Sequence, residues 1–234
     1  EKALQESEDF LNRTGEMAKV GGWQLDLETK RVIWTQTTGM IHELPDNYVP
    51  KLDEAINFYH PDDREIVSQS VNQALEKGES YEFEARLITA KGRQRWVRAL
   101  GQPTIKGGKC VQLSGTFQDI TESKQADEAL RQSEEKYRTL FKNMAQGVFY
   151  QSADGEISDF NQNALDMFGL SSDQFLGKTS FDPEWRVIHE DGSEYPGEQH
   201  PSMVALKTGK PVLDAIAGVF NPAKNDFSWL NINA

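Results

Sequence analysis

Two stretches of the sequence have residue types and spacings that enzymes use, and neither completes its pattern. Residues 172–179 have the spacing of a phosphate-binding loop, but Ser172 occupies the position of the first glycine and no buried strand is expected before it. Ser133 and Lys136 fit the pattern Ser-x-x-Lys, yet they lie in a solvated helical segment where neither desolvation nor an oxyanion site activates the serine. The sequence has no His-Glu-x-x-His run and no Gly-x-Ser-x-Gly turn. We therefore expect no enzyme within this chain.

The histidines and the cysteine are the remaining candidates for metal or haem chemistry, namely His42, His60, His189, His200 and Cys110. A proline follows His60 and His200, which places both at the entrance of a helix, where capping or hydrogen bonding is the expected role. The single cysteine excludes an intrachain disulfide and a cysteine-based metal site, and it is expected to be a small apolar strand residue. A reducing, cytoplasmic location is therefore expected.

Composition and charge limit the partners of the chain. Its 234 residues include 37 acidic and 25 basic side chains, which gives a formal net charge of −12 and a pI near 4.8. Nucleic acids and anionic membranes attract basic surfaces, so neither is expected as a partner. The longest stretch without a polar side chain, 215–220, is far shorter than the roughly 20 residues of a membrane-spanning helix. The length suits two small folded domains.

An internal repeat divides the chain into two copies of one module. The run Ala-Leu-Gln-Glu-Ser-Glu at 3–8 returns as Ala-Leu-Arg-Gln-Ser-Glu at 129–134. Trp23, which follows two glycines, is answered by Phe149, which follows Gly147 by two residues. Each copy therefore begins with a helix that leads into a strand.

The first copy shows a complete set of strand and helix signals. Alternating apolar and polar residues predict a hairpin of strands over 22–28 and 31–35. Helical spacing over 63–77 predicts a helix that ends at Gly78. Three strand-like runs follow, over 81–89, 94–102 and 110–118.

The second copy repeats these signals but stops early. Strands are predicted over 148–152 and 157–161, a helix over 201–207, and two further strands over 212–220 and 227–233. Alignment of Trp96-Val97 with Trp229-Leu230 places the last strand of this copy beyond residue 234. We expect the chain to be a fragment of a longer protein.

Two segments have the pattern of long amphipathic helices. The segment 122–143 is rich in Glu, Lys, Gln, Ala and Leu without Gly or Pro, and its apolar stripe repeats every 3.5 residues on average, the period of a coiled coil. The segment 1–20 has the same period. We expect a homodimer through both segments; the alternative is that each stripe packs on its own domain. The stripes are Leu4, Ser7, Leu11, Thr14 and Ala18, and Ala126, Leu130, Ser133, Tyr137, Leu140 and Met144.

Specific motifs in both copies point to one family. The motifs of the first copy are Gly22-Trp23, His60-Pro61-Asp62-Asp63-Arg64, Gly92-Arg93 and the run from Gly115 to Thr121. Those of the second are Asp154-Gly155, Asn161-Gln162-Asn163-Ala164 before Phe168-Gly169, Phe175-Leu176-Gly177-Lys178, the run from Trp185 to Gly192, and Glu198-Gln199-His200-Pro201. With these motifs the chain resembles tandem PAS sensor domains of bacterial and archaeal signalling proteins.

The resemblance implies an α+β fold class with two PAS folds, over 21–121 and 144–234. Each would be a five-stranded antiparallel sheet with helices on one face, joined by a coiled-coil-like linker helix over 122–143 after an N-terminal helix over 1–20. The last strand is central in that fold. We therefore expect the second sheet to lack its central strand within this chain, leaving unpaired backbone groups on its neighbours.

The family's cavity between sheet and helices holds a small organic ligand in some relatives, and aromatic residues concentrate where its walls would lie. Plain core packing is the alternative role for them. Haem and noncovalent flavin are alternatives to a cavity without a cofactor, whereas covalent flavin chemistry needs an Asn-Cys-Arg pattern that Cys110 lacks. The candidate cavity residues are Trp23, Trp34, Phe58, Tyr59 and Trp96 in the first copy, and Phe149, Phe160, Asn161, Phe168, Trp185 and Trp229 in the second.

The triplet Asp119-Ile120-Thr121 ends the first module where its last strand becomes the linker helix. A threonine there can cap the helix, and the resemblance implies that Asp119 and Thr121 couple movement of the sheet to the helix. The predicted function is sensory input and relay in a cytoplasmic signalling protein with a histidine kinase or diguanylate cyclase output. A ligand-free PAS dimerisation scaffold is the alternative.

Overall fold

The computed structural model describes residues 2–45, 48–49, 51–183 and 185–234. The chain divides into two compact units, Glu1–Leu130 and Arg131–Ala234. The division falls within one helix, α5 (Thr121–Asn143), which occupies the segment predicted to be the linker. Among the described residues, none of the helices combines the length and the apolar character that crossing a membrane requires.

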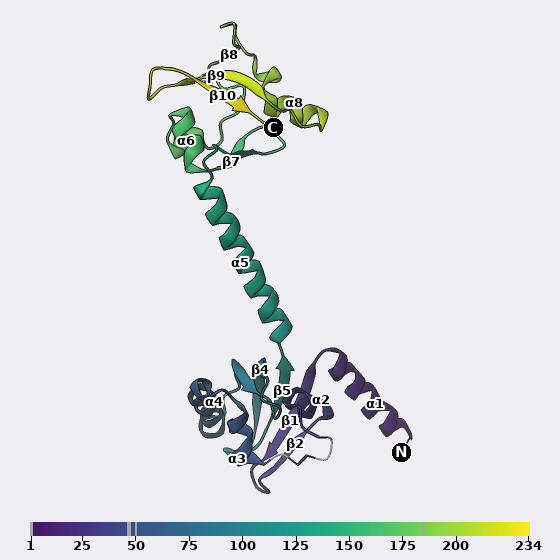
Figure 1. Ribbon diagram of the computed structural model, residues 1–234. Coiled ribbons are helices and arrows are strands. Elements are labelled where there is room, and N and C mark those ends of the chain that lie inside the picture. The colour runs from purple at the N-terminus through teal and green to yellow at the C-terminus, as the bar shows by residue number, and fades with distance from the viewer. Residues whose placement is uncertain (1, 46–47, 50, 184) are drawn as a thin grey trace. The chain divides into compact units, whose positions relative to one another are not determined.

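The first unit contains a five-stranded antiparallel sheet in the order β2-β1-β5-β4-β3 (Figure 1). The last strand along the chain, β5, is central and pairs with β1 on one side and β4 on the other. This sheet confirms the predicted fold. The strands are β1 (Val20–Asp26), β2 (Arg31–Trp34), β3 (Tyr81–Ile88), β4 (Gln94–Lys106) and β5 (Lys109–Asp119).

Strand β4 is longer than the alternation of its residues predicts. The predicted strand ended at residue 102 because Pro103 lacks a backbone N–H, whereas the observed pairing with β5 continues to Lys106 through a register shift after Thr104. Strand β3 pairs with β4 only as far as Gly101. Beyond that residue one edge of β4 is free of a neighbour, which is where a strand tolerates proline.

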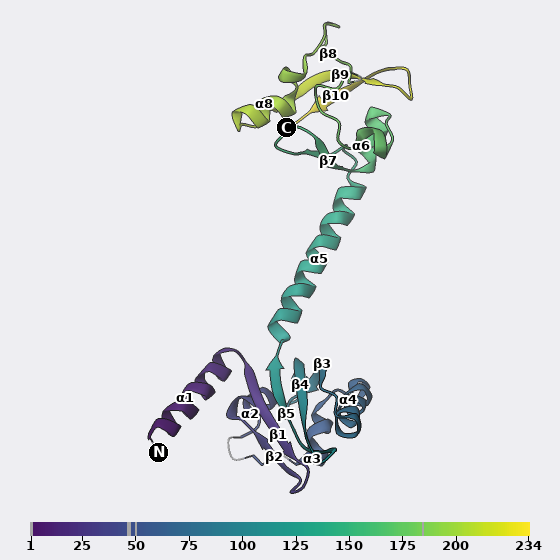
Figure 2. The same ribbon diagram turned by 180° about the vertical axis from the view of Figure 1, so that it is seen from behind.

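Helices cover one face of this sheet (Figure 2). Alternate residues of β3 and β4 are buried beneath them, among them Phe83, Leu87 and Val97, whereas the residues between point to the opposite face. Helix α4 ends at Gly78 with φ of 71°, as predicted. The covering elements are α2 (Gln36–His42), α3 (Leu52–Ala55), the 3₁₀ turns η1 (Ile56–Phe58) and η2 (Pro61–Asp63), and α4 (Arg64–Lys77).

Helix α1 (Lys2–Met17) occupies the predicted N-terminal segment and projects from the start of β1 (Figures 1 and 2). Phe10 and Met17 are largely exposed. The side chains of Leu4, Ser7 and Leu11, on which the predicted stripe depends, lie outside the described residues.

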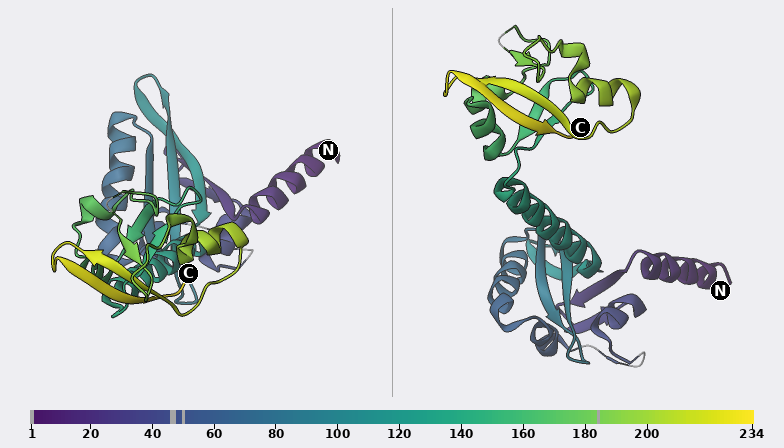
Figure 3. Two further views of the ribbon diagram at one scale, coloured as in Figure 1. Left: turned by 90° about the horizontal axis from the view of Figure 1, so that it is seen from above. Right: turned by 45° about the horizontal axis from the view of Figure 1, so that its top comes forward.

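The second unit contains two small antiparallel sheets in place of one. Strands β6 (Phe149–Gln151) and β7 (Ile157–Phe160) form a hairpin, as predicted. Strands β8 (Val187–Ile188), β9 (Ala215–Asn221) and β10 (Asp226–Ile232) form a second sheet in the order β10-β9-β8, with a long β9–β10 hairpin (Figure 3). The counterparts of β6 and β10 in the first unit, β1 and β4, both pair with β5. The partial sheet is therefore consistent with the predicted absence of a central strand. Strand β8 was not predicted, because two residues are too few to show an alternation of apolar and polar side chains.

Short helices pack against these sheets, and one phenylalanine lies at the centre of the core. Phe175 is fully buried and its ring contacts those of Phe149, Phe160, Phe168 and Trp185. The covering elements are α6 (Gln162–Phe168), α7 (Ser172–Phe175), the 3₁₀ turn η3 (Gly197–Gln199) and α8 (Pro201–Thr208).

Gly115 provides a test of the first sheet. It lies on β5 opposite Gly101 of β4, and a Cβ atom there would collide with the backbone carbonyl of Leu100. We expect Gly115→Ala to lower the free energy of unfolding of the first unit by about 1–3 kcal/mol, measured by urea titration. Gly39→Ala is the matched control. Apart from its chain neighbours and the backbone of its own helix, no atom of the described residues lies within 4 Å of its Cβ position, so the change should stabilise helix α2 by about 0.5–1 kcal/mol. Equal stability of the two variants would contradict the close packing of β4 on β5.

Candidate signal-relay site and cavity

The carboxylate of Asp119 joins the last strand of the first unit to helix α5. Asp119 is the final residue of β5, and its Oδ1 atom accepts hydrogen bonds from the backbone N–H of Thr121 at 2.9 Å and from the Thr121 hydroxyl at 2.6 Å. A carboxylate at this position satisfies a free N–H of the first turn and interacts favourably with the helix dipole. Asp119, not Thr121, is therefore the residue whose side chain caps α5.

Thr121 has a different role from the predicted cap. Its hydroxyl oxygen accepts a hydrogen bond of 2.9 Å from the backbone N–H of Trp96, so the first residue of α5 is attached to strand β4. Ile120, between the two polar residues, is buried, and its backbone N–H donates to the Trp96 carbonyl at 2.9 Å. The start of α5 is thus held to β4 by side-chain and backbone contacts of the whole triplet.

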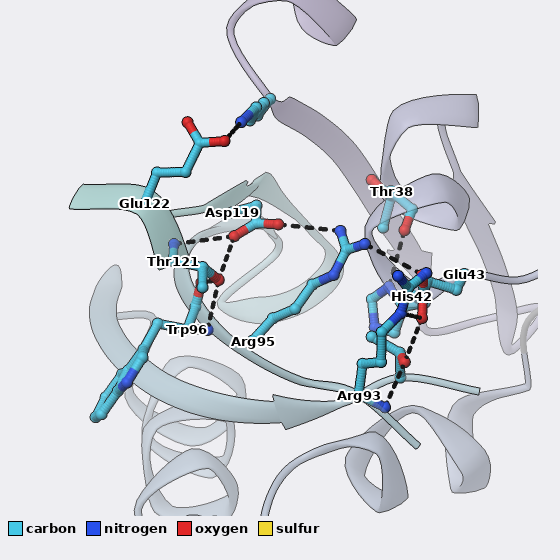
Figure 4. A network of polar contacts seen from close by, with 11 residues as sticks. Thr38, His42, Glu43, Arg93, Arg95, Trp96, Asp119, Thr121 and Glu122 are labelled. Carbon is cyan, nitrogen blue, oxygen red and sulfur yellow. Dashed lines mark hydrogen bonds and ion pairs between the residues drawn. The ribbon is translucent and has the colours of Figure 1, made fainter. Parts of the chain in front are cut away.

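Arg95 extends this site across the sheet to helix α2 (Figure 4). One of its terminal nitrogens lies 3.0 Å from Asp119 Oδ2, and the other lies 3.3 Å from Glu43 Oε1. Glu43 follows the last residue of α2, and its side chain is only 5% exposed. Arg93 also pairs with Glu43, and the Thr89 hydroxyl donates to Glu43 Oε2 at 2.6 Å.

The carboxylates of Glu43 and Asp119 are largely buried, so their ion pairs matter for stability. Removing one partner from a buried ion pair typically costs about 3–5 kcal/mol, because the other charge is left without compensation. Glu43, with four donors from three side chains, therefore fixes the end of α2 against β4 and the turn that precedes it. Asp119, 14% exposed, is similarly held by Arg95.

Two more exposed ion pairs flank the first turn of α5. Glu122 accepts from Lys19 Nζ at 2.5 Å, and Lys124 Nζ lies 2.6 Å from Glu84 while its ammonium stands over the Trp96 ring at 5.3 Å. All four side chains are between 31% and 83% exposed, so solvent screens both pairs and each contributes at most about 1 kcal/mol. These two pairs help to orient the first turn of α5, which the buried contacts of Asp119 and Arg95 hold in place.

A cavity of about 470 Å³ lies between the sheet of the first unit and its helices. Three of the candidate ligand residues, Trp23, Trp34 and Tyr59, lie in its lining. Phe58 packs behind the wall, with its ring 6.5 Å from that of Trp34.

The prediction that Trp96 lines this cavity is wrong. The neighbouring residues Val97 and Ala99 alternate into the core, so Trp96 lies on the opposite face of β4, where its ring meets Lys124. Its backbone, not its indole, serves the site, through the hydrogen bond to Thr121.

His42 lines the same cavity, which sequence analysis did not predict. Its Nδ1 donates to the Thr38 carbonyl at 2.8 Å, and its ring stacks between those of Trp34 and Phe117 at centroid distances of 4.4 and 4.9 Å. Burial lowers the pKa of His42 to about 4, so the ring is neutral near pH 7 with its proton on Nδ1. Helix α2 is only seven residues long, too short for its periodicity to show that this histidine points inward.

The candidate cavity residues of the second unit separate into two groups. Phe149, Phe168, Trp185 and Trp229 line a hollow of about 670 Å³ beside the two sheets. Phe160 belongs to the core around Phe175.

Asn161 has a structural role in place of the predicted cavity role. Its Oδ1 accepts from the backbone N–H groups of Val148 and Ala164, and its Nδ2 donates to the carbonyls of Phe141 and Gln146. All four of its amide hydrogen-bonding functions are used in this way, so the side chain caps α6 and secures β6.

The other histidines have local structural roles. His60 and His200 stand at the starts of η2 and α8, as predicted, with His60 Nδ1 accepting from the Asp62 N–H and His200 Nε2 bonded to the Tyr195 carbonyl. Within the described ranges, no cluster of three His, Cys, Asp or Glu side chains could hold a metal ion. Among the described residues that line the first cavity, none is cationic, so this lining does not fit the carboxylates of haem or the phosphate of a flavin nucleotide.

Comparison with known proteins agrees with this architecture. A family model for the PAS fold matches residues 31–117, and one for the PAS domain matches residues 135–198. Sensor protein FixL of Bradyrhizobium diazoefficiens is 29% identical over 160 residues, which cover 68% of this chain and 32% of that protein. Probable diguanylate cyclase DgcE of Escherichia coli is 25% identical over 178 residues, which cover 76% of this chain and 16% of that protein.

A solved structure is also similar. A sensory box histidine kinase/response regulator from Burkholderia thailandensis is 28% identical, with 56% of this chain and 98% of that chain covered and a TM-score of 0.47. The chain spans about a third or less of the length of the two curated relatives.

His42 makes stability depend on pH in a predictable direction. Its pKa is about 4 in the folded chain against 6.5 when unfolded, so the unfolded state binds the proton first and stability falls as the pH drops from 6.5 towards 4. We expect a loss of about 3 kcal/mol over this window from His42 alone. Urea titrations of the first unit from pH 7 to pH 4.5 measure it, with His42→Phe as the variant that removes this part of the slope. Parallel curves for the two proteins would contradict the assignment.

Proposed function

The chain carries two PAS domains in tandem, and from this premise we propose that it is the sensory input and relay segment of a signalling protein. Its domains are homologous to regions of a sensor protein and of a probable diguanylate cyclase. The proposed output is accordingly a histidine kinase or a diguanylate cyclase, and the proposed location is the cytoplasm. Within this chain the proposed role is non-catalytic: a small molecule binds in the first cavity and the change passes to α5.

The observation that carries the proposal is the continuous series of polar contacts from helix α2 to helix α5. Glu43 at the end of α2 holds Arg95, Arg95 holds Asp119, and Asp119 caps α5. A displacement of α2 by a ligand would change the position of Glu43 and with it the balance of contacts at Arg95. Such a network couples two sites when it has two arrangements whose populations the ligand shifts.

The cavity supports the sensory half of the proposal. His42, the last residue of α2, lines the cavity and precedes Glu43 directly in the sequence. A ligand that contacts His42 therefore acts one residue away from the start of the polar series. A volume of about 470 Å³ lies within the range of about 300–1,000 Å³ typical of small-molecule sites.

Exposed apolar residues on α5 support the proposed homodimer. Leu130 and Leu140 are 61% and 59% exposed, and Tyr137 is also exposed, although all three lie on the stripe with coiled-coil spacing. Apolar side chains at this spacing bury their surface when a second helix packs along them. The proposed partner is another molecule of the same protein, which pairs through α5 and α1.

The relay is tested by amide hydrogen exchange at the start of α5. Asp119→Ala removes the cap and the ion pair with Arg95, so we expect exchange of the N–H groups at 121–124 to accelerate about five- to tenfold while β4 and β5 stay protected. Asp127→Ala, which alters an exposed carboxylate of the same helix, is the control. In the protein joined to its output domain, Asp119→Ala should abolish the response to stimulus. Unchanged exchange and unchanged output would refute the relay.

Light scattering tests the dimer. We expect a mass of twice the 26.4 kDa chain, and a mass of one chain after Leu130→Lys combined with Leu140→Lys, because charge would then be buried in the seam. Gln125→Lys combined with Thr139→Lys adds the same charge away from the seam and should leave the dimer intact. A single-chain mass for the unmodified protein at high concentration would count against pairing.

A further inference from the structure

The described residues that line the cavity of the first unit carry no formal charge. They include indole, phenol and phenyl rings together with aliphatic side chains, one histidine and a few small polar groups. A charged ligand placed there would lose its hydration without gaining an ionic partner, which costs far more than burying a neutral molecule. The cavity therefore selects against carboxylates, phosphates and ammonium groups.

Aromatic rings form a large part of the wall. Trp23 and Tyr81 are stacked with centroids 6.4 Å apart, Tyr59 meets Phe83 edge-on at 5.9 Å, and Trp34 covers one side of the His42 ring. Faces and edges of rings are thus both present around the space. Ring pairs in such offset or edge-to-face geometries attract each other beyond the effect of area burial, which favours a planar aromatic ligand.

One polar atom of a buried residue in this wall is free to act as an acceptor. His42 is 2% exposed, its Nδ1 proton is used by the Thr38 carbonyl, and within the described part of the chain its Nε2 has no hydrogen-bond partner. Trp34 and Phe117 hold the ring from both sides, so Nε2 cannot turn away. In this tautomer Nε2 carries a lone pair and no hydrogen.

Two tyrosines also belong to the lining of this cavity. Tyr59 and Tyr81 line the cavity, and no residue in the described ranges accepts from or donates to either hydroxyl. A phenol can donate or accept, so these groups tolerate either kind of ligand atom. His42 Nε2 is the group that imposes a direction, because it can accept and cannot donate.

We propose that the first PAS cavity binds a small neutral aromatic molecule that carries an N–H or O–H group, and that this group donates a hydrogen bond to His42 Nε2. The biological use of this ligand rests on the proposed sensory function, whereas the binding itself does not. A ligand without the donor leaves Nε2 buried and unpaired, which costs about 1–3 kcal/mol, or about five- to 150-fold in affinity.

Indole and 1-methylindole are a matched pair of probes for this inference. They have nearly the same shape, and only indole has an N–H donor. We expect calorimetric titration of the full chain to show indole binding at least five times more tightly than 1-methylindole, with phenol and anisole behaving as the second pair. Indole-3-carboxylate tests charge and should bind more weakly than indole.

Two variants assign the discrimination to His42. In His42→Phe the ring stack is kept and the acceptor is lost, so indole and 1-methylindole should bind equally; Tyr81→Phe removes a hydroxyl and should leave the preference unchanged. Circular dichroism confirms that both variants fold. Equal affinities in the unmodified chain, tighter binding of the carboxylate, no binding of indole or phenol at millimolar concentration, or a preference that survives His42→Phe would each overturn the inference. The exchange measurement on Asp119→Ala needs no ligand, so the relay stands or fails independently.

Discussion

The ion pairs of Arg95 connect the end of helix α2 to the point where β5 leads into helix α5. Arg95 lies on the core-facing side of β4, yet its guanidinium reaches the rim of the core, where Glu43 and Asp119 flank it. Arg95 thereby pairs with two largely buried carboxylates that are far apart in the sequence, and Arg93 adds a second cation at Glu43. Because a buried charge is tolerated only when it is paired, the end of α2, the register of β4 and the start of α5 are mutually dependent.

The first domain contains both a cavity and a direct connection from its sheet to helix α5. The sheet supplies rigidity through the central strand β5, which has neighbours on both sides and leads directly into α5. The helical layer over the sheet leaves space between its side chains, and α2 in this layer spans only seven residues. In the proposed function, the sheet would carry the change to α5 and the helical layer beside the cavity would receive it. Glu43, at the end of α2, is where the two layers meet through charged groups.

The two domains show what the central strand contributes. In the first, β5 unites two hairpins into one sheet, whereas in the second the corresponding hairpins remain separate sheets within the described residues. The second core is nevertheless well defined, because Phe175 and the rings around it pack by shape and do not require continuous backbone pairing. The described residues of the second domain thus form one aromatic core beside two small sheets.

The sequence by itself determined the features that depend on local periodicity and on single residues. Alternation located the strands, helical spacing with Gly78 bounded α4, and the motif at Asp119 located the exit. Only the tertiary structure decided which partners meet. Glu43 and Arg95 are 52 positions apart, and no local sequence pattern predicts that they form an ion pair. His42 lies in a helix too short to show a face, and Trp96 was assigned to the wrong side because aromatic character does not reveal which face of a strand is covered. Periodicity encodes the form of each element, whereas the contacts between distant elements follow from sheet order and packing.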